Sequence, residues 1–181
     1  EMWAEIINIM FIAYNTTRIV EDKPKWINRL LTKTMNMLKK EQEMSLFQCS
    51  KILGYYGMVY TDLYKKNETA ALIRQYNYKE KTHVLSYYII KSLLLYNIDG
   101  FLDWCCDINH NYSINFNKNR ENMTKYITKY CELIRKCHDD PIYIENMNDL
   151  NNILKNILKN KKKINNKMIL TTLRMTVYEV K

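Results

Sequence analysis

Apolar residues recur along most of the chain at the three- and four-residue spacing that an α-helix produces. In the first stretch, residues 2–20, they form one stripe: Trp3, Ile6, Ile7, Met10, Phe11 and Tyr14. A second helix is predicted to begin at Asp22, because Pro24 is tolerated in a first turn, where its missing N–H costs nothing. Ser45 and Gln48 have the spacing of a capping box, which predicts a separate helix over 45–66 after one over 24–41.

The most apolar helix is predicted over residues 79–96. Its second half is apolar on nearly every side, which is typical of a helix buried by its neighbours. Asp99 and Gly100 are then expected to break the chain before a short helix over 101–108. Residues 109–119 contain five Asn without periodicity and indicate a loop. This loop is where we expect any subdivision of a single domain spanning 1–181.

Two amphipathic helices are predicted over 123–137 and 147–158. Asp139, Asp140 and Pro141 separate them, because proline disfavours helical geometry in the residue before it. Residues 160–167 form a polar, basic connector, and 168–180 suit either a helix or a strand, of which we favour the helix. The pattern therefore predicts an all-α, compact single-domain bundle of about eight helices, with pairs that resemble helix-turn-helix units.

Composition excludes several other classes. Three Gly and two Pro in 181 residues are too few for a β-sandwich or barrel, which needs frequent turns, and no glycine-rich phosphate loop can be formed. The longest apolar stretches fall short of a membrane span, and no signal peptide pattern is visible. Five cysteines without a C-x-x-C spacing predict reduced thiols, so we expect a cytoplasmic location, with the nucleus as an alternative.

The net charge of +9 is distributed unevenly. Residues 1–40 carry +3, residues 41–110 carry −1 and residues 111–181 carry +7. The first basic group is Lys25, Arg29 and Lys33, flanked by Lys23, Lys39 and Lys40. The second is Lys118, Arg120, Lys125 and Lys129, and the third includes Lys155, Lys159, Lys161, Lys162 and Lys163.

These groups predict contacts with an RNA backbone. Lys and Arg neutralise phosphates without reading sequence, and unpaired bases stack on aromatic rings such as Tyr112 and Phe116, near the second group. The competing interpretation is that each group is only a solvated surface, because charge alone specifies no ligand. We predict a non-enzymatic RNA-binding protein, with a helical protein–protein interaction scaffold as the alternative.

No constellation supports catalysis or a metal. Cys105, Cys106 and His110, or Cys131 with Cys137 and His138, have zinc-type ligands but not the short regular spacings of structural zinc sites. The three histidines have no nucleophile at a recognisable spacing. We therefore expect no catalytic residue, no metal and no cofactor.

Large side chains exceed what one core of this size requires. Three Trp, ten Met and fifteen Tyr are residue types enriched at the centres of protein interfaces. A closed, symmetric homodimer explains them most simply, and it would join two basic surfaces.

Three segments carry a resemblance to a known family. They are residues 1–17 (EMWAEIINIMFIAYNTT), 23–38 (KPKWINRLLTKTMNML) and 53–63 (LGYYGMVYTDL), in a Lys-, Asn- and Ile-rich chain. The chain resembles the early gametocyte RNA-binding phosphoproteins of malaria parasites. The resemblance implies an all-helical homodimer that binds RNA, is phosphorylated and acts in sexual differentiation. The PxxP motif of that family is missing, since Pro24 and Pro141 stand far apart.

Overall fold

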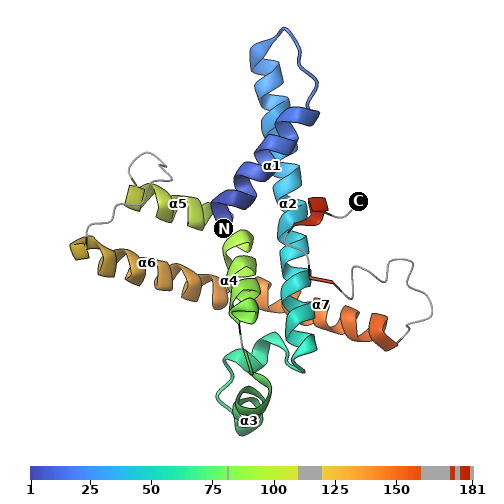
Figure 1. The fold of residues 1–181 in the computed structure, drawn as a ribbon, viewed down its shortest axis with the longest axis vertical. Helices are drawn as coiled ribbons and strands as arrows, with labels where there is room; N and C mark the ends of the chain where they lie inside the picture. The colour runs from blue at the N-terminus through green and yellow to red at the C-terminus, as the bar shows by residue number, and fades with distance from the viewer. Residues whose placement is uncertain (81, 110–119, 160–171, 174–175, 180–181) are drawn as a thin grey trace.

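The computed structural model describes residues 1–80, 82–109, 120–159, 172–173 and 176–179. Over these residues the protein is a helical bundle without a strand, which confirms the predicted all-α class, with seven α-helices where about eight were expected (Figure 1). In chain order they are α1 (Met2–Thr16), α2 (Lys23–Tyr55), α3 (Glu68–Asn77), α4 (Val84–Tyr96), α5 (Ile98–Asn109), α6 (Arg120–His138) and α7 (Pro141–Lys159). Two 3₁₀ turns, η1 (Tyr60–Leu63) and η3 (Val177–Glu179), complete the described elements.

Helix α2 runs without a break through the predicted boundary between residues 41 and 45. The predicted start at Ser45, and with it the helix-turn-helix pair, is therefore wrong. Ser45 is buried inside the helix, and its hydroxyl donates to the carbonyl oxygen of Gln42 at 2.8 Å. No Gly or Pro occupies residues 25–53, so nothing in that stretch stops the helix from propagating.

Helix α2 ends at Tyr55, earlier than the predicted end at residue 66, and Gly57 follows it. Gly57 has a φ of 65°, a left-handed conformation that favours glycine. The N–H of Met58 donates to the Leu53 carbonyl at 2.9 Å, and that of Gly57 donates to the Gly54 carbonyl at 3.0 Å. This pair of bonds is a Schellman motif, which satisfies the last carbonyls of a helix.

Other helix boundaries follow side-chain caps. Asp22 accepts from the N–H of Lys25 at 3.1 Å, which confirms the predicted start of α2. Asp140 accepts from the N–H of Ile142 at 2.8 Å and so begins α7 at Pro141, six residues before the predicted 147. The expected break at Asp99 and Gly100 is wrong, because both lie inside α5.

Helix α4 lies at the centre of the molecule and confirms the prediction of a buried helix (Figure 1). Leu85, Tyr88 and Leu93 pack into one core with the second half of α2 and with α7. Leu94 and Leu95 pack into a second core with α1 and α5. Each fully buried side chain of this kind stabilises the fold by about 1.5–3 kcal/mol. The two cores meet at α4, which therefore holds the bundle together.

Helix α1 and the first half of α2 form an antiparallel arm that projects from this body (Figure 1). The rings of Tyr14 and Trp26 pack edge to face with centroids 5.8 Å apart. The stripe of α1 that is buried consists of Met2, Ile6, Ile9 and Ala13. The apolar stripe predicted from the sequence is thus divided: Ile6 faces the core, whereas its other members on α1 beyond Trp3 stay exposed.

Two predictions fall largely outside the described residues. The loop over 109–119 is described only at Asn109, the last residue of α5. The helices on either side of it pack together, with the rings of Trp104 and Tyr130 4.9 Å apart. The connector over 160–167 is not described, and of 168–180 only 172–173 and 176–179 are, where η3 is a short 3₁₀ turn.

Candidate nucleic-acid interface

One flank of α2 within the arm gathers the first predicted basic group. The helical spacing places Lys25, Arg29 and Lys33 on the same side, and Lys40 continues this row toward the body. All four line an open hollow of about 710 Å³. Its other lining residues are Asp22, Pro24, Asn28, Thr32, Asn36 and Met37. Four cationic side chains against one carboxylate make the hollow electropositive.

The basic residues of this hollow differ in their exposure and in their hydrogen bonds. Lys25 and Arg29 are exposed. The ammonium of Lys33 donates to the carbonyl oxygen of Thr16 at 2.7 Å, at the last turn of α1. The helix dipole also favours a cation at this end of a helix. Lys33 therefore ties α1 to α2 as well as lining the hollow. Lys23 and Lys39 are exposed but do not line it.

The second predicted group is only partly described. Lys118 lies outside the described residues, and Arg120 is the first residue of α6. Lys125 is exposed, and Lys129 forms an ion pair with Asp107 at 3.1 Å. An exposed pair of this kind contributes about 0–1 kcal/mol and partly neutralises Lys129.

The third group lies on the last turns of α7, where Lys155 and Lys159 are exposed. Lys161, Lys162 and Lys163 lie outside the described residues. The beginnings of α2 and α6 and the end of α7 point to three different ends of the molecule (Figure 1). Within one chain, the structure thus gathers the first group and keeps it apart from the described residues of the other two.

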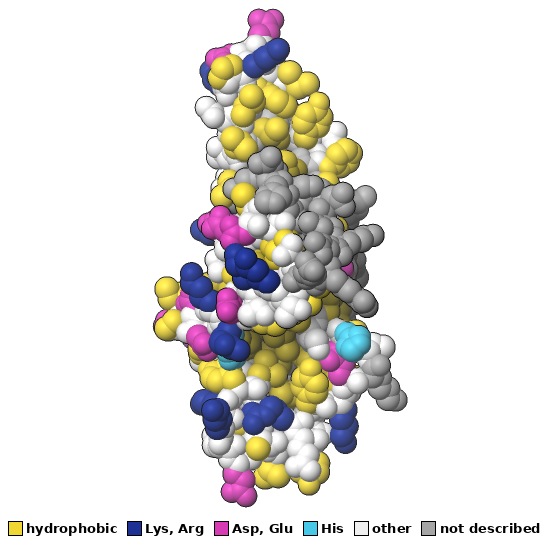
Figure 2. Space-filling view, turned by 90° about the vertical axis from the view of Figure 1, so that its left-hand side faces the viewer, with side chains coloured by type: hydrophobic (Ala, Val, Ile, Leu, Met, Phe, Trp, Pro, Cys, Tyr) yellow, Lys and Arg dark blue, Asp and Glu magenta, His cyan; other side chains and the backbone are white. Residues whose placement is uncertain are grey.

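The other flank of the arm is apolar. A rotation of about 100° per residue places Ile27, Leu31 and Met35 away from the basic row on α2. They are exposed together with four residues of α1: Ile7, Met10, Phe11 and Tyr14. Figure 2 shows hydrophobic side chains gathered over this part of the molecule. We call these seven residues the apolar face of the arm.

A buried charge cluster at the base of the arm was not predicted. The ammonium of Lys91 lies 2.8 Å from Glu5 Oε2 and 3.8 Å from Glu41 Oε1. Glu41 also accepts from the hydroxyl of Thr176 at 2.8 Å and from the N–H of Val177 at 2.9 Å. Burial raises the pKa of Glu41 despite these donors. The sequence features that could have indicated this cluster were one Lys in the most apolar helix, α4, and one Glu in α1.

Of the described cysteine and histidine candidates, Cys105 and Cys137 pack in the two cores. Cys137 is buried and accepts from the Asn97 amide at 3.3 Å, and a ring nitrogen of His138 lies 2.6 Å from the hydroxyl of Tyr60. Burial raises the pKa of Cys105, whereas Cys131 is exposed. Over the described ranges, no three His, Cys, Asp or Glu side chains gather as a metal ion requires. His110 lies outside these ranges.

These observations define an all-α protein with a basic hollow and an apolar face on two flanks of one projecting arm. No helix over the described residues is both long and apolar enough to cross a membrane. No family model, curated protein or solved structure matches the chain.

Proposed function

We propose that this chain is a non-enzymatic, homodimeric RNA-binding protein that holds the phosphate backbone of a single strand in the hollow along α2. The observation that carries the proposal is the row of Lys25, Arg29, Lys33 and Lys40 along one hollow. A row of cations of this kind can neutralise phosphates along a nucleic-acid strand. Phosphorylation and a role in sexual differentiation stay predictions from the resemblance.

The proposed contacts are electrostatic and do not read sequence. Lys25 and Arg29 extend into solvent, so they reach phosphates without a change of fold. Each neutralised phosphate of a single strand releases counterions and contributes about −0.7 to the slope of log affinity against log salt. Three or four contacts therefore give a slope of about −2 to −3.

The apolar face supports the dimer. Half-exposed side chains of this size present roughly 100 Å² each, so the seven together approach the ~800 Å² that each partner buries in a standard interface. Between residues 2 and 17 the only charged side chain is Glu5, which is buried, so the outer side of α1 is free of charge. Two arms packed through this face would form a four-helix bundle. The basic hollow, on the other flank of α2, stays accessible.

The experiment for RNA binding is a fluorescence-anisotropy titration with a single-stranded oligonucleotide at several salt concentrations. We expect Lys25→Glu with Arg29→Glu to weaken binding at least tenfold and to reduce the salt slope by about 1.4. The matched control is Lys65→Glu with Lys66→Glu, two exposed lysines beyond the opposite end of α2. Equal losses in both double variants would contradict a site in the hollow.

The experiment for the dimer is light scattering coupled to size exclusion. Leu31→Glu with Met35→Glu is expected to give a folded monomer, because both side chains are exposed in the single chain. A monomeric natural protein would contradict the dimer. A dimer that binds no RNA at low salt would instead favour the interaction scaffold.

A further inference from the structure

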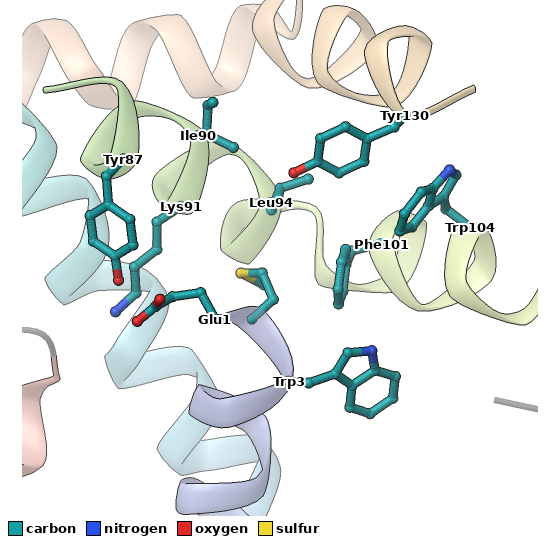
Figure 3. A pocket seen from close by; sticks show the side chains of 10 residues that line it. Glu1, Trp3, Tyr87, Ile90, Lys91, Leu94, Phe101, Trp104 and Tyr130 are labelled. Carbon is teal, nitrogen blue, oxygen red and sulfur yellow. The ribbon is translucent and has the colours of Figure 1, made fainter. Parts of the chain in front are cut away.

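A cavity of about 350 Å³ opens where the start of α1 meets α4, α5 and α6. Figure 3 shows the rings of Trp3, Phe101, Trp104 and Tyr130 gathered at one end of it. Ring centroids are 6.2 Å apart for Trp3 and Phe101, and 6.1 Å apart for Phe101 and Trp104. Trp104 and Tyr130 follow at 4.9 Å. The rings thus form a continuous aromatic wall, in a cavity of the size that binds small ligands.

The other end of the cavity is polar. Glu1, Tyr87 and Lys91 extend toward one another there (Figure 3). Glu1 supplies a carboxylate acceptor. The ammonium of Lys91 is held by Glu5 at 2.8 Å. Burial, and then the nearby Glu1 carboxylate, raise the pKa of Tyr87, so its hydroxyl is a neutral donor at physiological pH. Donors and an acceptor therefore stand side by side.

This combination restricts the class of ligand. An anion would meet the carboxylate of Glu1, and a cation would meet the ammonium of Lys91. A wholly apolar ligand would remove water from the polar end without replacing its hydrogen bonds. A flat, neutral heteroaromatic ring with donors and acceptors on its edge satisfies both ends.

We propose that this cavity holds one unstacked nucleobase of the RNA strand that lies in the hollow along α2. This inference rests on the proposed function. Helix α2 links the two sites: Lys40 lines the hollow, and the next residue, the buried Glu41, lies 3.8 Å from Lys91, which lines the cavity. Aromatic stacking combined with hydrogen bonds to the base edge is how proteins recognise unpaired bases.

Tryptophan fluorescence tests the cavity directly, because Trp3 and Trp104 line it and Trp26 lies on the arm. Nucleoside monophosphates are expected to quench the emission saturably in the natural protein and in Trp26→Phe. Ribose 5-phosphate, which lacks the base, is the control ligand and is expected to leave the emission unchanged. Equal effects of the sugar phosphate and the mononucleotides would overturn the proposal.

Binding of single-stranded RNA provides the second readout. Trp104→Leu is expected to lower the affinity roughly tenfold, the size of one lost stacking contact. Glu1→Gln, which keeps the size of an exposed side chain and removes its charge, is expected to change the ranking of the four mononucleotides. Unchanged affinity in Trp104→Leu and an unchanged ranking in Glu1→Gln would overturn the proposal.

The failures of the two proposals are distinguishable. Lys25→Glu with Arg29→Glu leaves the cavity intact, so mononucleotides are expected to quench this variant as they quench the natural protein. If mononucleotides quenched the emission of a protein that binds no RNA, the proposed RNA-binding function would be overturned. The proposal that the bound base belongs to an RNA strand would be overturned with it. RNA binding through the hollow without any quenching would overturn the cavity alone.

Discussion

Replacing Lys91 with methionine tests the buried charge cluster most sharply. The substitution keeps most of the length of the side chain but removes an ammonium that lies 2.8 Å from Glu5 Oε2 and 3.8 Å from Glu41 Oε1. Lys91 and Glu5 are only 5% and 7% exposed, so water cannot replace the lost partner. The Glu5 carboxylate would be left in the interior without its ammonium partner.

The expected loss is about 3–5 kcal/mol of unfolding free energy, the cost of removing one partner of a buried ion pair. For a chain of this length each kcal/mol lowers the Tm by roughly 2–4 °C, so the Tm falls by about 6–20 °C. Lys129→Met is the matched control. Lys129 pairs with Asp107 at a similar 3.1 Å, but the two side chains are 42% and 62% exposed. We expect that variant to lose less than about 1 kcal/mol.

Circular dichroism during thermal and urea unfolding measures both variants. Adding Glu5→Gln to Lys91→Met is expected to recover part of the loss, because it removes the stranded charge. If Lys91→Met were as stable as Lys129→Met, burial would not decide the strength of these ion pairs, and the reasoning would be refuted.

Three further outcomes are expected. The folded-state pKa of Glu41 is raised above its ordinary 4.5, so the contribution of Glu41 to the free energy of unfolding is greatest at low pH and falls as pH rises through the raised value. Urea unfolding at several pH values measures this contribution, and Glu41→Gln should lose this pH dependence. Gly57→Ala should cost roughly 1–2 kcal/mol in the same unfolding assay, because a side chain strains the φ of 65° and approaches Asn77 at 3.1 Å; an unchanged midpoint would argue against the Schellman end. In a thiol-labelling time course, exposed Cys131 should react at once and Cys49, whose pKa burial raises to about 12, only on unfolding; simultaneous labelling would contradict its burial.

Sequence reasoning located features that depend on a few neighbouring residues. Asp22 before Pro24 predicted the start of α2, and Pro141 predicted the end of α6, because a cap or a proline acts within one helical turn. It failed at Ser45, where the capping pattern lies inside a strong helix and the hydroxyl bonds to Gln42 instead. A local motif cannot show whether the preceding helix continues through it.

The candidate site likewise has features that local spacing predicts and features that depend on distant contacts. The spacing of Lys25, Arg29 and Lys33 already placed them on one flank of a helix. The hydrogen bond from Lys33 to Thr16 joins residues 17 positions apart, so it cannot be inferred from the residue spacing within one helix. Helix α1 is apolar on most sides, so only the positions of α2 and α4 decide that Ile6 is buried and Phe11 is exposed. The apolar face is therefore a property of the fold.

The contact between Glu41 and Thr176 also has a consequence for biosynthesis. Their hydrogen bond joins residues 135 positions apart. A ribosome that adds ~5–20 residues per second needs on the order of ten seconds to cover this distance. During that time α2 has emerged, but its buried carboxylate lacks the donors of Thr176 and Val177. A nascent chain that stalls in between therefore lacks both of these hydrogen bonds at the base of the arm.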